Sequence, residues 1–205
     1  MKPKHLAGVE RVVLASGNTG KIKEIGALLK TLGVEVVPQS EVGIPEAEET
    51  GLSFVENAII KARHAALHTQ LPAIADDSGL EVDALGGAPG VFSARYAGPA
   101  AKAADNNAKL LRALEGLPSR ARNARFRSVI VFMRHHADAS PLIAEGSWEG
   151  RILESPRGEG GFGYDPLFLV AGKNASAAEL PPEEKNRLSH RGQALRRLLA
   201  ALSAE

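Results

Sequence analysis

A βαβ pattern near the N-terminus is the feature that most restricts the fold of this 205-residue chain. Residues 11–16 form an apolar segment typical of a strand buried on both faces, as parallel strands are. A glycine-rich turn follows at residues 17–21, then apolar residues at helical spacing as far as Gly33, then a second apolar segment at residues 34–37. This order predicts two strands joined by a helix, and therefore an α/β fold.

Further segments continue the alternation of strands and helices. Ser53 and Glu56 match the capping box S-x-x-E and predict a helix that runs to about His68. Residues 1–10 are interpreted as an N-terminal leader that precedes one domain over residues 11–205. A turn is expected at Glu149-Gly150. The other predicted elements are strands at 73–75, 129–133, 142–148, 151–153 and 166–170, and helices at 101–114, from Pro181 and after Gly192.

Composition excludes several classes of protein. The chain has no cysteine, which rules out disulfides and thiol catalysis. It has no apolar run near the ~20 residues of a membrane span, and a cytoplasmic location is expected. The net charge of +1 argues against nucleic acid as a partner. The basic cluster at residues 120–127 is a local exception, which a solvated loop and strand edge also explains.

Two adjacent carboxylates follow the short apolar segment 73–75. Asp76 and Asp77 are expected at the exit of that strand, where ligands bind in open α/β sheets. At an effective dielectric constant of about 20, two unit charges 4 Å apart repel by roughly 4 kcal/mol. A hard cation such as Mg²⁺ would relieve this repulsion. The alternative is that Asp-Asp-Ser-Gly forms a helix cap or an ordinary turn.

Two further features suggest phosphate binding. The turn before the first helix, residues 17–21, presents backbone N–H groups and Lys21 to an anion, although a plain strand-to-helix turn is the alternative. It is not a Walker A loop, since Ile22 stands where that motif has Ser or Thr. Lys61 lies on the second helix, where it is either a solvated lysine or a phosphate contact.

Two segments of the second half suggest recognition of a flat base. Residues 158–166 are rich in glycine, which permits close backbone approach, and Phe162 and Tyr164 could stack on a base. The alternative is a flexible loop with two anchoring aromatics. His190 and Arg191, at a helix junction, are either an anion or base contact or part of a helix C-cap.

Taken together, seven segments in one order resemble the inosine triphosphate pyrophosphatase family, most closely its bacterial branch. The likeness extends over about residues 11 to 203. The segments are Ser16–Lys21, Glu48–Gly51, Glu56–Ala58, Lys61–Arg63, Asp76–Gly79, Gly161–Asp165 and Ser189–Ala194.

The resemblance implies a fold and an activity. The fold would be a two-lobed α/β structure, with a long twisted mixed sheet flanked by helices and the active site in the cleft between the lobes. The enzyme would be a homodimer that hydrolyses ITP, dITP and XTP to the monophosphate and pyrophosphate with Mg²⁺. This reaction removes deaminated purines from the nucleotide pool.

The resemblance also implies roles for particular residues. Asp77 would be the catalytic acceptor and a metal ligand, with Lys61 and Asp76 in the same site. Glu48 would be a second metal-associated carboxylate, although Glu49 beside it is an alternative. The substrate-binding residues would be Ser16, Gly17, Asn18, Thr19, Gly20, Lys21, Ser78, Phe162, Gly163, Tyr164, Asp165, Lys185, His190 and Arg191.

Three alternatives stay open at this point. A pyrophosphatase of the related Maf-like class would prefer dTTP or UTP, but the His190-Arg191 pair and residues 162–165 argue against it. A nucleotide-binding protein without turnover would not need Asp77 as a base. Nucleic-acid binding through residues 120–127 is disfavoured by the near-zero net charge and the 4% aromatic content.

Overall fold

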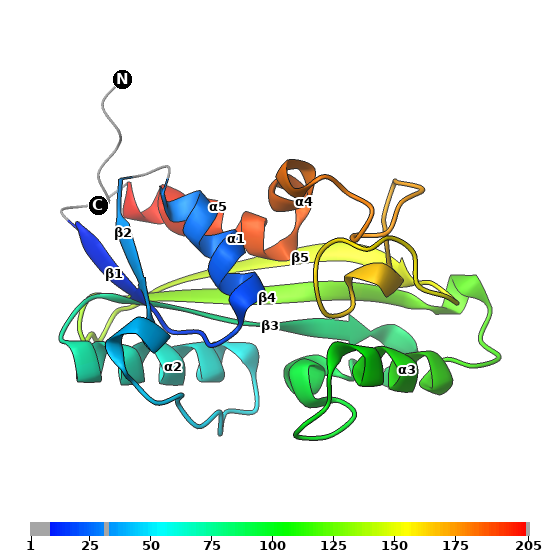
Figure 1. Ribbon diagram of the computed structural model, residues 1–205, viewed down its shortest axis with the longest axis horizontal. Coiled ribbons are helices and arrows are strands. Elements are labelled where there is room, and N and C mark those ends of the chain that lie inside the picture. The colour runs from blue at the N-terminus through cyan, green and yellow to red at the C-terminus, as the bar shows by residue number, and fades with distance from the viewer. Residues whose placement is uncertain (1–8, 31–32, 204–205) are drawn as a thin grey trace. The chain divides into compact units, whose positions relative to one another are not determined.

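Six strands form one sheet in the part of the chain that the structure, a computed structural model, describes: residues 9–30 and 33–203. The strand order is β2-β1-β3-β4-β5-β6. Figure 1 labels β1 to β5. The strands are β1 (Arg11–Leu14), β2 (Glu35–Pro38), β3 (Ala73–Val82), β4 (Asn123–Met133), β5 (Leu142–Ile152) and β6 (Phe168–Val170). The helices are α1 (Thr19–Lys30), α2 (Phe54–Thr69), α3 (Ala103–Ala113), α4 (Pro182–Leu188) and α5 (His190–Leu202).

The sheet is mixed. β1 pairs in parallel with β2 and with β3, through Val13↔Ala73 and Leu14↔Ile74 in the second pair. β6 is antiparallel to β5. The predicted βαβ unit and the mixed α/β sheet are therefore confirmed. None of the described helices is both long enough and apolar enough to cross a membrane.

The chain divides into two compact units, which are described separately. Unit 1 comprises residues 1–77, 128–146 and 191–205, and unit 2 comprises residues 78–127 and 147–190. Residues 1–8 of the expected leader lie outside the described part of the chain, whereas Val9 packs against a core cluster of unit 1. The prediction of one domain over residues 11–205 remains a prediction.

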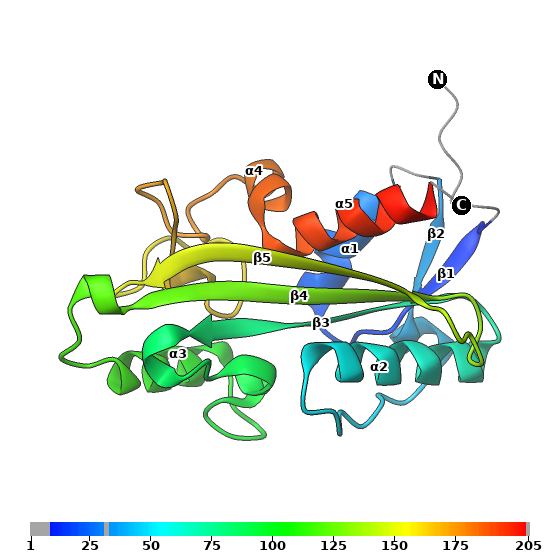
Figure 2. The same ribbon diagram turned by 180° about the vertical axis from the view of Figure 1, so that it is seen from behind.

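Unit 1 has helices on both faces of its part of the sheet. On one face, Ile74 packs with Ile25 of α1 and Leu195 of α5. On the other face, Ala73 and Ala75 pack with the alanines of α2, namely Ala58, Ala62, Ala65 and Ala66. Figures 1 and 2 show α1 and α5 together on one side of these strands and α2 on the other.

Unit 2 has a separate core, which is rich in aromatic side chains. Leu110 and Leu114, in and directly after α3, pack in one cluster with Leu80 of β3. Phe126, Trp148 and Phe168 come from β4, β5 and β6, and their rings contact one another at centroid distances of 4.6 to 6.4 Å. Unit 2 therefore has a hydrophobic core of its own, to which residues of β3, β4, β5 and β6 contribute.

Two predictions about strands were wrong. Asp76 and Asp77 do not lie at the exit of a three-residue strand, because β3 continues to Val82. No turn interrupts the sequence at Glu149-Gly150 either, since β5 is continuous and Gly150 pairs with Val170. In both places residues typical of turns lie inside strands, because pairing with a neighbouring strand outweighs their local preference.

Candidate active site

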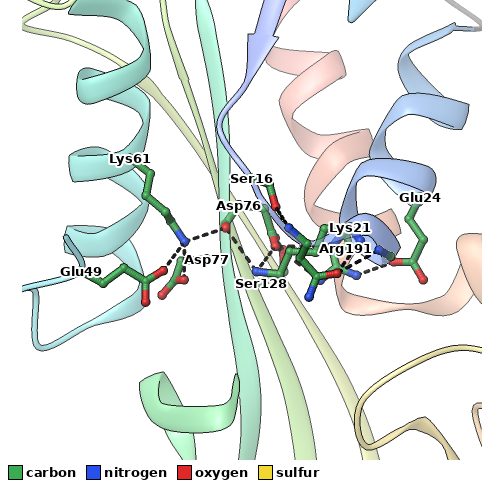
Figure 3. A network of polar contacts seen from close by, with 11 residues as sticks. Ser16, Lys21, Glu24, Glu49, Lys61, Asp76, Asp77, Ser128 and Arg191 are labelled. Carbon is green, nitrogen blue, oxygen red and sulfur yellow. Dashed lines mark hydrogen bonds and ion pairs between the residues drawn. The ribbon is translucent and has the colours of Figure 1, made fainter. Parts of the chain in front are cut away.

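Asp76 and Asp77 point to opposite faces of β3, because side chains alternate along a strand. Asp76 lies on the face covered by α1 and α5, and Asp77 lies on the face covered by α2. β1 pairs with β3 only at Ala73 and Ile74, so the pairing ends before Asp76. The Asp76 carbonyl instead accepts hydrogen bonds from Lys21 Nζ at 3.3 Å and Lys61 Nζ at 3.0 Å. Figure 3 shows the two lysines on either side of the strand.

The Asp76 carboxylate is the centre of a buried cluster of charges. Its side chain is fully buried and accepts from Lys21 Nζ at 2.8 Å, Ser128 Oγ at 2.5 Å and Arg191 Nη2 at 3.4 Å. Arg191 also pairs with Glu24 of α1. Burial alone would raise the pKa of Asp76, but the charges of Arg191 and Lys21 outweigh it and lower that pKa far below its usual range. Asp76 is therefore an ionised anchor.

The Asp77 carboxylate is in a different environment. Lys61 Nζ donates to Asp77 Oδ1 at 2.6 Å and to Glu49 Oε1 at 2.9 Å, so one ammonium joins two carboxylates. Burial raises the pKa of Asp77, and the charges of Lys61 and Lys21 only partly oppose it. Burial alone would lower the pKa of Lys61, but Asp77 and Glu49 together raise it. Asp77 therefore holds a proton more readily than an ordinary aspartate, which suits a general base.

The expected phosphate turn is organised by Asn18. Its side-chain Oδ1 accepts from the backbone N–H groups of Gly20 at 2.9 Å and Lys21 at 3.1 Å, and so caps the start of α1. The Asn18 N–H donates to Ser16 Oγ at 3.2 Å. Burial lowers the pKa of Lys21 in spite of the nearby Asp76. The turn thus presents one partly buried lysine, and an anion that binds the two amides would replace the Asn18 carboxamide.

The carboxylates suit a metal ion of a particular kind. Asp77 and Glu49 supply hard oxygen donors that converge on one cation, Lys61, whereas the Glu48 side chain is exposed. Within residues 9–30 and 33–203 there is no cluster of three or more His, Cys, Asp or Glu that could hold a metal ion. Two carboxylates fit Mg²⁺, which commonly takes one or two protein carboxylates and completes its shell with phosphate oxygens and water.

The aromatic and glycine-rich loop is built around Asp165 in unit 2. Asp165 Oδ2 accepts from the Phe162 N–H and from Lys185 Nζ, both at 2.7 Å. Lys185 Nζ also lies 5.0 Å from the centre of the Phe162 ring. Gly163 has a φ of 61°, a left-handed conformation that favours glycine. Its carbonyl accepts from Asn107 Nδ2 at 3.0 Å. The loop is therefore held by specific contacts.

His190 and Tyr164 are buried in the same unit. The His190 ring stacks on Phe126, with centroids 4.8 Å apart and an interplanar angle of 13°, and lies 6.4 Å from Trp148. Tyr164 Oη donates to the Ser93 carbonyl at 2.8 Å, and burial raises the pKa of the tyrosine. These contacts make Tyr164 part of the core, so Phe162, which is partly exposed, is the better candidate for stacking on a base.

The structure groups the predicted residues into two sets. Unit 1 contains Ser16 to Lys21, Lys61, Asp76, Asp77 and Arg191, and unit 2 contains Phe162 to Asp165, Lys185 and His190. Ser78 is the first residue of unit 2, and its side chain is partly exposed. Several supporting residues were not predicted from the sequence: Glu24, Glu49 as a partner of Lys61, Asn107, Phe126, Ser128 and Trp148.

Only some of these supporting residues left a signal in the sequence. Glu24 is three residues after Lys21, which places both on one face of α1. Ser128 alternates with Phe126 and Ile130 along β4, which places a hydroxyl in an apolar row. Their partners Arg191 and Asp76 are 167 and 52 residues away, and no local pattern indicates those pairings.

Comparison with known proteins gives one consistent result. A model of the Ham1 family matches residues 12–201. The dITP/XTP pyrophosphatase of Methylococcus capsulatus is 66% identical over 194 residues, which is 95% of this chain and 96% of the relative. That of Escherichia coli K12 is 55% identical over 95% of this chain and 98% of its own. A solved HAM1 protein from Coxiella burnetii has a TM-score of 0.87 at 53% identity, and the match covers 95% of this chain and 99% of that chain.

Proposed function

This chain belongs to the Ham1 family, and we propose that it uses the charged residues of unit 1 to hydrolyse dITP, XTP and ITP. The dITP/XTP pyrophosphatase activity follows from near-full-length similarity to curated relatives, and the resemblance noted in the sequence is confirmed. The reaction breaks the α–β phosphoanhydride bond and releases the nucleoside monophosphate and pyrophosphate. The roles of individual residues are the proposal.

One observation supports the assignment of the chemistry to unit 1. Lys61 Nζ lies within 3 Å of the carboxylates of both Asp77 and Glu49, on the α2 face of β3. In our proposal Asp77 orients or deprotonates the attacking water. Lys61 and Lys21 stabilise negative charge on the leaving pyrophosphate. Asp76 holds Lys21 and Arg191 in place.

A metal ion belongs to the same proposal. Asp77 and Glu49 would hold Mg²⁺, with Glu49 preferred to Glu48 because its carboxylate already lies at the Lys61 ammonium. When bound, the ion neutralises charge on the phosphate oxygens. The chain's own part is to keep the two carboxylates close together. The carboxylates of Asp77 and Glu49 repel each other, and the Lys61 ammonium, which pairs with both, offsets this repulsion.

Recognition of the base is assigned to the residues of unit 2. Phe162, Lys185 and His190 offer a partly exposed ring and buried donors, which suit a flat purine with a 6-keto oxygen. A site that hydrogen-bonds a keto group can reject an analogue lacking it by about 10⁴-fold or more. Arg191 is engaged by Asp76 and Glu24, so its expected contact with the base stays a prediction. The cleft between lobes and the homodimer remain expectations from the resemblance, and the cytoplasmic location remains an expectation from the composition.

The experiment measures pyrophosphate release with Mg²⁺ from ITP, XTP, dITP, ATP, GTP, dTTP and UTP. We expect fast release from the inosine and xanthine nucleotides and slow release from the others. Release mainly from dTTP or UTP would favour the Maf-like alternative instead. Tight binding without any release would favour a nucleotide-binding protein. Repeating the assay with Glu49→Gln and Glu48→Gln tests the metal assignment, because only the first should raise the Mg²⁺ concentration required for half-maximal rate.

A further inference from the structure

The loop that carries Glu49 is attached to the first turns of α2 by two side chains. Asn57 Oδ1 accepts from the Gly51 N–H at 2.8 Å. Glu56 Oε2 accepts from the Leu52 N–H at 3.0 Å and from Ser53 Oγ at 2.6 Å. The Asn57 bond is the inner attachment, because Asn57 is fully buried while the Glu56 contacts are exposed.

Asn57 is an unusual residue for its position. Its exposed fraction is 0%, and its Nδ2 has no hydrogen-bond partner among the residues that the structure describes. A buried amide donor without a partner costs about 1–3 kcal/mol, and an apolar side chain of similar size would avoid that cost. The part of Asn57 that contributes is therefore its Oδ1, the atom that holds Gly51.

Gly51 provides an independent sign of the same attachment. A Cβ at this position would lie 2.6 Å from Glu56 Cβ, 2.7 Å from Asn57 Oδ1 and 3.0 Å from the Asn57 backbone nitrogen. The φ of Gly51 is not in the left-handed region, so the glycine is required by close approach rather than by backbone conformation. The loop thus lies directly against the helix at this point.

The attachment bears on the site through the geometry of α2. Asn57 and Lys61 are four residues apart on the helix, so they lie on one face about one turn from each other. Glu49 is two residues before Gly51, and its carboxylate reaches Lys61 Nζ at 2.9 Å. One helix face therefore holds both the loop and the ammonium that receives the loop's carboxylate.

We propose that Asn57 is a positioning residue that keeps Glu49 beside Lys61 and Asp77, and that Gly51 is the point on which it acts. This inference rests on the proposed metal role of Asp77 and Glu49. If that role holds, loss of the Asn57–Gly51 bond should weaken metal binding without any change in the ligands themselves. Loss of supporting hydrogen bonds around a metal site typically weakens affinity by about 10- to 100-fold.

The test uses Mn²⁺ alone as the probe, with the free ion measured by electron paramagnetic resonance in the absence of nucleotide. Asn57→Ala and Gly51→Ala should each weaken Mn²⁺ binding about 10-fold or more. Hydrogen exchange should become faster in the peptide that contains residue 51. Because Gly51→Ala leaves Asn57 in place, it keeps the test decisive if Asn57→Ala does not fold.

Asn106 offers a matched control. It is another buried asparagine near the start of a helix, and its Oδ1 accepts from the Ala97 N–H at 2.7 Å. Asn106→Ala removes an equivalent attachment in unit 2, so it should lower stability but leave Mn²⁺ binding unchanged. Adding Asn57→Ala to Glu49→Gln should weaken binding no further, because Asn57 acts through Glu49.

Two results separate the possible failures. If Glu49→Gln weakens Mn²⁺ binding and both Asn57→Ala and Gly51→Ala leave it unchanged, the positioning role is wrong and the metal site stands. If Glu49→Gln itself has no effect, the proposed metal site is wrong, and this inference with it. An equal effect of Asn106→Ala would also overturn the inference, because it would show only a general loss of stability.

Discussion

Neighbouring residues in this chain have opposite electrostatic roles. Asp76 is held ionised by Lys21 and Arg191 in a buried cluster, while burial raises the pKa of Asp77. The difference arises because the two side chains face different helices. It predicts that replacement of Asp76 by asparagine lowers stability, whereas replacement of Asp77 by asparagine lowers turnover.

Asp76→Asn should destabilise the protein by about 3–5 kcal/mol at pH 7, since it breaks the ion pairs that the buried Asp76 carboxylate makes with Lys21 and Arg191. The pKa of Asp76 is lowered in the folded state, so its contribution is present above the ordinary aspartate pKa of about 4 and is lost below it. Urea unfolding of both proteins between pH 7 and pH 3 should therefore show the difference narrowing only below about pH 4. A constant difference down to pH 3 would contradict this account.

Asp77→Asn should lower kcat by at least about 100-fold while leaving the fold intact. The fold should stay intact because the raised pKa of Asp77 means that the folded state already disfavours its charged form. Removal of that charge therefore costs little stability. Steady-state pyrophosphate release and thermal unfolding of the same preparation provide the two measurements. If the variant keeps near-normal rates, Asp77 is not the base.

At the scale of the elements, β5 depends on a glycine for its close pairing with β6. A Cβ at Gly150 would meet the Leu169 carbonyl and would lie 2.5 Å from Phe168 Cζ. Gly150→Ala should therefore destabilise the protein by about 1–3 kcal/mol, the typical cost of overpacking. Gly26 in α1 is the matched control, because its Cβ would meet nothing within 4 Å.

In α1, replacement of glycine by alanine should have the opposite effect on the free energy of unfolding. Gly26→Ala is expected to stabilise the protein by about 1 kcal/mol, the difference in helix propensity. Denaturant titrations of both variants test the pair. Destabilisation by Gly26→Ala, or no effect of Gly150→Ala, would contradict this account. It would show that the space around each glycine does not determine how the alanine changes the free energy of unfolding.

The existence and type of the helices and strands could be predicted from the sequence more reliably than their lengths. The capping box at Ser53 predicted the start of α2 correctly, since Ser53 Oγ accepts from the Glu56 N–H. The continuation of β3 through Ser78 and Gly79 was missed, because those residues suit turns and the pairing that overrides them comes from distant segments. The lysines of the site could be predicted from motifs, but Ser128 and Glu24 could not be paired with their partners from local spacing.

At the scale of the whole molecule, unit 1 is assembled from three separate stretches of sequence. Its core cluster combines Ile25 and Ile74 with Ile130 and Phe132 of β4 and Leu198 of α5. A fragment that ends at residue 77 would lack the last three contributions and leave apolar surface exposed to water.

That fragment, residues 9–77, should therefore not fold alone. We expect it to show little protection in hydrogen exchange and rapid digestion by trypsin, whereas the full chain resists both. A protected core in the fragment would contradict the view that the C-terminal helix and β4 complete unit 1.

The alternation of side chains along β3 also restricts how such a sequence can diverge. The pairing with β1 fixes Ala73 and Ile74, so the face on which each later side chain lies depends on whether its distance from Ile74 is odd or even. Insertion of one residue between Ile74 and Asp76 would turn Asp76 toward the face covered by α2 and Asp77 toward the face covered by α1 and α5, although both carboxylates would remain. Surface loops can lengthen by any number of residues during evolution, whereas an odd insertion in this segment keeps both carboxylates on their faces only if a β-bulge absorbs the extra residue.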